Sequence, residues 1–417
     1  MRNLFDQYEQ PENKLTHAIV TALAQDSQLL RGFLKLMGCG KPPATRKLKV
    51  VEQSLVGELE VSEEEAERKG LPDAWIYDDE GWCLLIESKI ASRLTSGQLS
   101  RHHRTAQRCG FEDITVLAIE ATPTRIKASR WLITTTWEEI YVWLISRRAE
   151  SAWARLVAEY FEVAERKFTD AGYLKEGSLT VFSGIPFDED NPYSYLEAKR
   201  VLKLLLAEVR KDTRFCREAG IDHTLEGRGA ITGKKSKAVW DYLRLKGASA
   251  DAKHTQYPHF TIGINRDHVN VTVTLPNGML GPLKRNFKDM GYQGFKGCIE
   301  GVLRSMAPLT VKDEGFTPWG AAVQRRYPGR SSDAIIDGQM GFDLRTAIPV
   351  KGSKVKLQEQ WLEFVYDTYC QKNSNYQLQF GAIIPYARST KVHDREVIDL
   401  IKGAWLSCRP LIDQVMG

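Results

Sequence analysis

The chain has 417 residues, of which 42% are hydrophobic, 10% aromatic and 27% charged, and its formal net charge is +5. This composition is typical of a folded protein of roughly two to three domains and excludes collagen, coiled coil and extended disorder. The sequence has no apolar run of about 18 residues and no signal-like N-terminus, which predicts a cytoplasmic protein without a membrane partner.

Charge differs between the two parts of the chain. Residues 1–170 contain 23 Lys and Arg against 26 Asp and Glu, whereas residues 171–417 contain 35 against 27. We therefore expect two regions, 1–170 and 171–417, with a further division of the second near residue 310. The basic excess of the second region permits a polyanionic partner.

The seven cysteines form no Cys-x-x-Cys pair, which argues against a disulfide framework and a structural zinc site.

Periodicity and turn residues predict the elements of the first region in chain order. The expected elements are helices from Pro11 and after Asp26, a strand at 47–56, a charged excursion at 57–69, strands at 72–77 and 82–89, a helix at 95–108, strands at 114–119 and 131–134, and helices from 136 and at 151–168. The region is therefore expected to be α/β, with an αβββαβ core and a mixed sheet.

The second region has a different element order. The expected elements are a helix at 192–211, a basic Gly-rich stretch at 227–247, strands at 258–264 and 268–275, a helix at 293–306, a strand at 341–348, a helix at 356–371, a strand at 376–384 and a terminal helix at 394–413. This pattern indicates an α+β or α/β region without internal repeats.

The turn at Asp78-Asp79-Glu80-Gly81 predicts a hairpin that brings two acids together. If residues 79–81 form the loop with Gly81 in the left-handed conformation, Asp73 lies opposite Glu87. Directly opposed residues have Cβ atoms about 4.5 to 5.5 Å apart, and two carboxylates at that distance repel unless a cation lies between them. Oxygen ligands of this kind suit Mg²⁺, and Mn²⁺ can take its place.

Lys89 lies two residues beyond Glu87, so alternation along the strand places it on the same face as both acids. A metal, two carboxylates and an ammonium are the groups that phosphodiester hydrolysis needs. The metal activates a water and neutralises phosphoryl charge, while the lysine orients the water or stabilises the pentacovalent state. Glu12, in the first turn of the first helix, is a further candidate ligand on position alone.

Glu-x-Lys spacing by itself is weak, because Glu67, Glu165 and Glu197 begin the same pattern with a basic residue two positions on. Only Glu87-Ser88-Lys89 ends an apolar strand and follows Pro-Asp across a hairpin. The structural alternative is a surface salt bridge of Lys89 with one of the acids. The continuous apolar run before Glu87 argues against that alternative.

With these motifs the first region resembles the PD-(D/E)XK nucleases, which share the restriction-endonuclease-like fold. The resemblance spans about residues 10 to 135 and rests on Glu12, Pro72-Asp73 and Glu87-Ser88-Lys89 in αβββαβ order. It implies metal-dependent cleavage of nucleic acid, with Asp73 and Glu87 as metal ligands and Lys89 as the water-orienting group. Gln98 and His102 resemble a fourth motif on the following helix, although tyrosine is common where His102 stands.

Two further segments are candidates for contact with nucleic acid. The helix at 95–108 and the residues before it present Arg93, Arg101, His102 and Arg104, which suit phosphates, although a solvated basic helix face is the alternative. The segment 227–236 fails the P-loop spacing. Its Lys234 and Lys235 are expected either to contact a phosphate backbone or to lie on a plain solvated loop.

The sequence thus predicts a divalent-metal-dependent nuclease joined to a basic region that recognises substrate or a trigger. The resemblance favours DNA over RNA, and the architecture suggests prokaryotic defence against foreign DNA. The alternative is a catalytically silent nucleic-acid-binding or sensor protein that retains the fold. An activating ligand, a partner protein and a homo-oligomer stay open, as does regulation of the nuclease by the second region.

Overall fold

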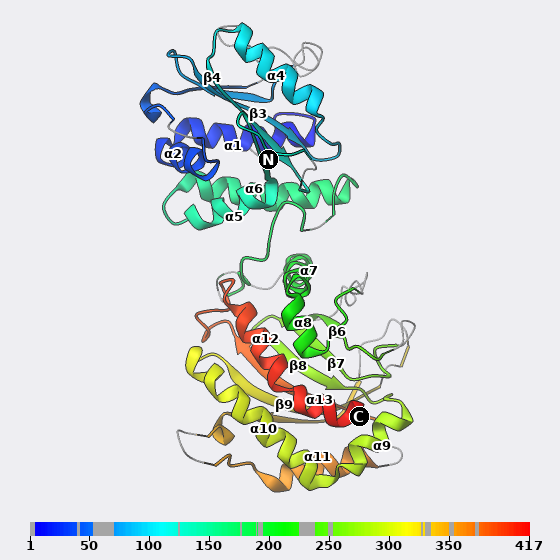
Figure 1. Ribbon diagram of the computed structural model, residues 1–417. Coiled ribbons are helices and arrows are strands. Elements are labelled where there is room, and N and C mark those ends of the chain that lie inside the picture. The colour runs from blue at the N-terminus through cyan, green and yellow to red at the C-terminus, as the bar shows by residue number, and fades with distance from the viewer. Residues whose placement is uncertain are drawn as a thin grey trace. The chain divides into compact units, whose positions relative to one another are not determined.

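The computed structural model describes residues 5–39, 42–52, 71–123, 126–175, 177–188, 190, 195–224, 238–248, 253–326, 328–329, 335–349, 354–371 and 375–417. The chain forms two compact units, Met1–Val181 and Phe182–Gly417, each with helices and one sheet (Figure 1). In the described part of the chain, no helix is both long enough and apolar enough to cross a membrane.

The first unit is a mixed α/β unit. Its elements are α1 (Pro11–Gln25), α2 (Ser27–Leu36), β1 (Lys49–Glu52), β2 (Ala74–Tyr77), β3 (Trp82–Lys89), α4 (Ser96–Arg108), β4 (Asp113–Glu120), β5 (Leu132–Thr136), α5 (Trp137–Arg147) and α6 (Ala152–Asp170). Pro11 begins α1 where its missing N–H costs nothing, and Thr136 with Glu139 forms a capping box at the start of α5.

The five strands form one sheet in the order β1-β2-β3-β4-β5. The pairs β1–β2 and β2–β3 are antiparallel, whereas β3–β4 and β4–β5 are parallel. The predicted hairpin register is confirmed, because Ala74 pairs with Ile86 and Tyr77 with Cys83. Gly81 has φ 101°, the left-handed conformation that this loop requires.

Helices cover both faces of this sheet. Ile86 and Leu117 pack against α1, α5 and α6, through residues that include Leu15, Tyr141 and Phe161. On the other face, Trp75, Leu85 and Val116 pack against Leu99 and Ala106 of α4. In Figure 1 the sheet accordingly lies between α4 on one side and α1, α5 and α6 on the other. Because Glu87 has the same parity as Leu85, it belongs to the α4 face.

The boundary between the units lies later than the predicted one at residue 170. Leu179 and Val181 are buried in the core of the first unit. Glu165 of α6, only 1% exposed, accepts hydrogen bonds from the backbone N–H groups of Leu179 and Thr180 and from the Thr180 hydroxyl. The segment after α6 therefore belongs to the first unit, although nothing in its sequence forms a helix or strand.

The second unit is built on an antiparallel sheet. Its elements are α7 (Tyr195–Lys211), α8 (Thr213–Ala219), β6 (Ala238–Arg244), β7 (His259–Asn265), β8 (His268–Leu275), α9 (Gly281–Asp289), α10 (Gly291–Lys312), β9 (Thr317–Arg326), β10 (Ile335–Asp343), α11 (Glu359–Cys370), β11 (Tyr376–Pro385), α12 (Val397–Ser407) and α13 (Arg409–Met416). The strands lie in the order β10-β9-β11-β8-β7-β6 and every pair is antiparallel, which makes this unit α+β.

Several expected elements of the second unit differ from the structure. The single terminal helix at 394–413 is wrong, because the helix ends at Ser407 and α13 starts one residue before Pro410, whose missing N–H breaks the pattern. The strand expected at 341–348 is β10 at 335–343. The division expected near 310 falls inside α10, and the sheet joins strands from both sides of that point. The excursion at 57–69 lies outside the described residues.

Candidate functional site

The candidate site lies where β2 begins and β3 ends, on the α4 face of the first sheet. The register places Asp73, just before β2, at the position facing Glu87. Glu87 is 2% exposed, whereas Asp73 is half-buried. Asp73 Oδ2 accepts hydrogen bonds from the Ser88 backbone N–H at 2.8 Å and from the Ser88 hydroxyl at 2.9 Å. These two bonds fix the Asp73 carboxylate against the end of β3.

Lys89 lies between carboxylates from two elements. Its Nζ is 3.5 Å from Oε1 of Glu87 and 3.7 Å from Oε1 of Glu12 on α1. Burial acts to lower the pKa of Lys89, but the nearby carboxylates of Asp73, Glu87 and Glu12 outweigh it and raise that pKa above its usual value. The ammonium therefore stays charged and acts as a donor and a positive charge rather than as a base.

The helix α4 contributes two side chains to Glu87. Gln98 donates from Nε2 to Oε1 of Glu87, and His102 Nε2 lies 3.2 Å from Oε2. The latter contact lacks hydrogen-bond alignment, so Glu87 Oε2 and both His102 ring nitrogens have no hydrogen-bond partner among the described residues. Gln98 and His102 thus reach Glu87 from the same face of α4.

The two acids repel each other. Burial and the charge of Glu87 raise the pKa of Asp73 well above its usual value, although Lys89 and the Ser88 hydrogen bonds act to lower it. A repelling pair of carboxylates, one of which keeps a buried oxygen without a hydrogen-bond partner, is a donor set that suits a hard divalent cation. Asp73 and Glu87 are therefore the residues that could hold the predicted Mg²⁺.

Glu12 occupies a different position from the acid pair. It is 8% exposed, and its Oε1 lies 3.7 Å from Nζ of Lys89. Within the described residues, no three His, Cys, Asp or Glu side chains converge closely enough to hold a metal. The structure thus brings Glu12 to the site through Lys89, and its role as a ligand stays a prediction.

One acidic residue near the site was missed by the sequence analysis. Glu120 ends β4 beside Lys89 in the parallel register and is 6% exposed. Its Oε1 accepts a hydrogen bond of 3.0 Å from the Leu94 backbone N–H, which ties down the segment between β3 and α4. The sequence feature that could have identified Glu120 is its position at the end of an apolar strand, like that of Glu87-Ser88-Lys89.

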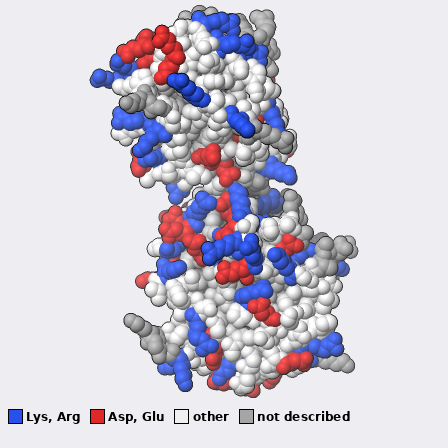
Figure 2. Space-filling view, in the orientation of Figure 1, with Lys and Arg blue, Asp and Glu red and all other residues white. Residues whose placement is uncertain are grey.

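The residues predicted to contact nucleic acid are divided by their burial. Arg93, Arg101 and Arg104 are exposed, and Figure 2 shows basic side chains gathered over α4. His102 is 1% exposed and points to Glu87, so its predicted contact with nucleic acid is wrong. The buried residues of α4, which are Leu99, His102 and Ala106, face the sheet. Lys234 and Lys235 lie outside the described residues.

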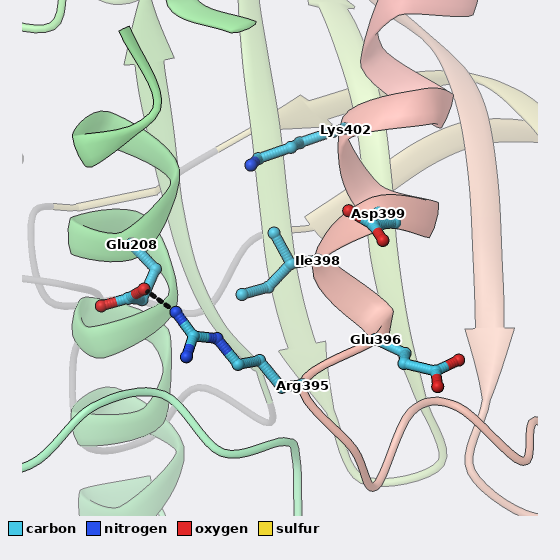
Figure 3. A pocket seen from close by; sticks show the side chains of 6 residues that line it. All are labelled: Glu208, Arg395, Glu396, Ile398, Asp399 and Lys402. Atoms are coloured by element: carbon cyan, nitrogen blue, oxygen red, sulfur yellow. Dashed lines mark hydrogen bonds and ion pairs between the residues drawn. The ribbon is translucent and has the colours of Figure 1, made fainter. Parts of the chain in front are cut away.

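A pocket in the second unit offers a different set of charges. It has a volume of about 320 Å³ and is lined by Glu208 of α7 and by Arg395, Glu396, Ile398, Asp399 and Lys402 in and before α12 (Figure 3). Arg395 pairs with Glu208 at 2.6 Å, and Lys402 pairs with Asp212 at 2.7 Å. Because these charges neutralise one another, the acid pair of the first unit is the better candidate for chemistry.

Comparison with known proteins adds no assignment to this geometry. No protein-family model matches the chain, and no curated protein sequence matches it significantly.

Proposed function

We propose that the first unit is a divalent-metal-dependent nuclease of the PD-(D/E)XK type. The observation that carries the proposal is the convergence at the hairpin: Asp73 faces Glu87, and the Lys89 ammonium lies 3.5 Å from Glu87. The order of helices and strands around this point, α-αβββαβ, supports the resemblance noted from the motifs. Two acids and an ammonium at one strand end are also the groups that phosphodiester hydrolysis requires.

The surrounding residues have defined roles in this proposal. Asp73 and Glu87 would hold Mg²⁺, which when bound lowers the pKa of a water and neutralises phosphoryl charge. Ser88 fixes Asp73, and Gln98 orients Glu87 through its amide. Lys89, kept charged by its carboxylate neighbours, donates to a phosphoryl oxygen or to the attacking water.

Substrate binding is assigned to the basic face of α4. Arg101 and Arg104 are exposed on the helix that carries Gln98 and His102. Arg101 lies about 60° around the helix from Gln98 and would hold a phosphate near the acid pair, whereas Arg104 lies on the side opposite His102 and would contact the backbone farther from it. DNA is favoured over RNA on the resemblance alone.

The test is a cleavage assay on plasmid, linear DNA and RNA, with Mg²⁺ or Mn²⁺ and with chelator. We expect metal-dependent cleavage that falls by at least about 100-fold in Glu87→Gln and in Lys89→Ala, because each removes a charge at the reacting centre. The matched control is Lys199→Ala, which removes the lysine of the Glu-x-Lys spacing in α7 and should cleave like the parent chain.

Metal binding is measured separately from turnover. Mg²⁺ should raise the melting temperature of the parent chain and of Lys89→Ala, but not that of the double variant Asp73→Asn, Glu87→Gln, because a ligand stabilises only the state that binds it. Nucleic-acid binding that persists in all variants while none of the substrates is cut with either metal would contradict the nuclease proposal. It would favour the silent nucleic-acid-binding alternative.

A further inference from the structure

The segment before β5 forms a turn that carries a tryptophan at its corner. Ser129 and Leu132 exchange backbone hydrogen bonds of 3.0 and 3.2 Å, which places Arg130 and Trp131 at the corner of the turn. The carbonyl oxygen of Trp131 accepts a hydrogen bond of 2.8 Å from the Val116 N–H of β4. The backbone that carries Trp131 is therefore fixed to the sheet.

Trp131 forms an aromatic pair with α4. Its ring centroid lies 4.8 Å from that of His103, at an interplanar angle of 53°. Burial lowers the pKa of His103, so the imidazole is uncharged at neutral pH and packs as an aromatic ring. Both side chains are half-buried, and the indole also packs against the core beneath α4. A tryptophan held in this way loses little side-chain freedom when a further ring stacks on it.

Exposed cations lie on both segments that form this aromatic pair. Lys127 and Arg130 belong to the segment of Trp131, and Arg104 and Arg108 belong to the helix of His103. All four are exposed, and among the described residues none of them forms an ion pair with a carboxylate. Helix α4 contains no Asp or Glu that would repel a phosphate. These cations are therefore available to a polyanion.

A diagonal row of polar side chains on α4 leads from the acid pair to the aromatic pair. Each step of three residues turns about 60° around a helix, so residues three apart form a ridge across its surface. In α4 this ridge, which we call the α4 ridge, consists of Gln98, Arg101, Arg104 and Gln107. It begins at Gln98, which donates to Glu87, and it ends one turn beyond His103 on the side of Trp131. A phosphate backbone that follows the ridge thus passes two exposed arginines.

The two ends of this path are more than one nucleotide apart. Glu87 pairs through Ala118 with Thr134, which lies three residues from Trp131 along the chain. The separation is two strand spacings across the sheet and three residues along it, or about 14 Å between backbone positions. The indole would therefore contact a base farther along the strand than the nucleotide at the acid pair.

We propose that Trp131 and the α4 ridge bind an unpaired nucleic-acid strand and lead it to the acid pair. Arg101 and Arg104 contact its phosphates, and a base stacks on the indole beside His103. Only an unpaired base offers its face to a side chain, because a base within a duplex is covered by its neighbours. The destination of the strand rests on the proposed nuclease function, whereas the binding itself requires neither acid.

The experiment compares binding of the full chain to a fluorescent single strand of about 20 nucleotides and to the corresponding duplex, by anisotropy in chelator. DNA and RNA are measured separately. We expect Trp131→Ala to raise the dissociation constant for the single strand roughly fivefold or more and to leave that for the duplex within about twofold, because the lost interaction is base stacking. Trp131→Phe, which keeps a stacking ring, should recover most of the affinity. The matched control is Trp361→Ala, which removes an exposed tryptophan from α11 and should bind like the parent chain.

Arg104→Gln tests the α4 ridge without disturbing the core, because its side chain is exposed. The slope of log Kd against log salt concentration for the single strand should fall by about 0.7, which is the contribution of one phosphate contact. Arg148→Gln serves as the control, because Arg148 is exposed at the end of α5, on the other face of the sheet. It should keep the parental slope.

Cleavage assays with Mg²⁺ and Mn²⁺ separate this inference from the nuclease proposal. Trp131→Ala should raise KM for a single strand roughly fivefold and leave kcat within about twofold, because the ring lies away from the reacting bond. The inference is overturned if Trp131→Ala binds the single strand like the parent chain, or if it weakens binding of single strand and duplex by the same factor. If binding depends on Trp131 and Arg104 but neither metal supports cleavage, the strand site stands and the nuclease proposal fails.

Discussion

Ser88 determines where the Asp73 carboxylate lies. Its side chain is fully buried and is shared between two elements: the hydroxyl donates to Asp73 and lies 2.8 Å from the Thr16 hydroxyl of α1. One small polar residue thus connects α1, β3 and the start of β2. Because Ser88 lies between Glu87 and Lys89, one tripeptide provides two residues of the candidate site and the side chain that positions Asp73.

Replacing Ser88 by alanine should therefore affect stability as well as cleavage. Ser88→Ala leaves Asp73 with one hydrogen bond fewer in a partly buried place, which costs about 1 to 2 kcal/mol in the free energy of unfolding. Urea denaturation in chelator measures this cost. Ser146→Ala removes a hydroxyl that bonds Trp143 O on an exposed part of α5, and its effect should stay within about 0.5 kcal/mol. Equal losses in the two variants would contradict the assigned role of Ser88.

His259 gives the second unit a defined pH dependence. The ring is 4% exposed, its Nδ1 lies 3.0 Å from Tyr257 O, and burial lowers its pKa from 6.5 to about 4. The folded state therefore keeps the ring neutral where the unfolded chain binds a proton. This contribution to stability is complete above pH 6.5 and is lost as the pH falls toward 4.

The measurement compares the parent chain with His259→Asn, which keeps a donor for Tyr257 O but does not titrate. Between pH 6.5 and 4 the parent should lose up to about 1.4 kcal/mol of unfolding free energy per pH unit relative to the variant. Carboxylates titrate in both proteins and cancel in the difference. Parallel curves over this range would show that His259 is protonated in the folded state.

At the residue scale the sequence could predict what depends on local chain geometry. The loop at Gly81 and strand alternation fix which residues oppose Glu87, so the Asp73 pairing followed from spacing. The burial of His102 did not follow, because its neighbours Arg101 and His103 are as polar as it is and the sequence leaves the rotation of α4 undetermined. Glu120 enters the site only through the parallel pairing of β3 with β4, a contact between distant parts of the chain.

Two helices of the first unit are linked through their N-terminal caps. Asp26 caps α2 by accepting from the backbone N–H groups of Gln28 and Leu29, and its other oxygen accepts from the Ser151 hydroxyl at 2.6 Å. Ser151 in turn caps α6 by accepting from Ala154 N–H. Each cap therefore holds the other in its capping geometry.

Loss of either cap should weaken both helices. Asp26→Ala and Ser151→Ala should each cost about 1 kcal/mol. The double variant should cost less than the sum, by about 0.5 kcal/mol or more, because the residues are in contact. Urea denaturation measures this coupling. The control pair combines Asp26→Ala with Asp212→Ala, the cap of α8 in the other unit, and should be additive. An additive Asp26 and Ser151 pair would mean that the caps act separately.

At the element scale, amphipathic helices with clear starts were predicted well, and the least periodic elements were missed. The strand β9 begins with Thr317-Pro318 and contains Gly320, so its composition resembles a loop, yet it is held in the middle of the sheet between β10 and β11. The short helix α8 depends on the Asp212 cap and on the packing of Phe215 rather than on a long apolar stripe. The conformation of such segments is determined by their contacts with distant parts of the chain rather than by local sequence.

At the scale of the whole molecule, the boundary after Val181 predicts which fragment folds. A chain of residues 1–181 retains Leu179, Val181 and the hydrogen bonds to Glu165. A chain that ends at residue 170 loses both side chains and these hydrogen bonds, and it exposes the surface of α6 that they cover. We expect it to be less stable by roughly 3 kcal/mol or more, from the loss of two buried aliphatic side chains.

Thermal and urea unfolding of the two fragments measure this difference. Leu179→Ala in the longer fragment should reproduce about 2 to 3 kcal/mol of the loss. Leu196→Ala in the full chain, at an exposed position on α7, serves as the control and should change little. If the two fragments are equally stable, the boundary lies near residue 170, as the sequence predicts.

The strand β3 is antiparallel to β2 and parallel to β4, and its two faces enter different cores. A slip of one residue in its pairing with β2 would turn Glu87 and Lys89 toward the aliphatic layer under α1 and bring Ser88 out in their place. Such a chain would have to bury two charges, and it would also lack the acid pair. The pairing of β3 with β2 therefore determines both the burial of these charges and the assembly of the candidate site, so a chain with the slipped register would lack that site.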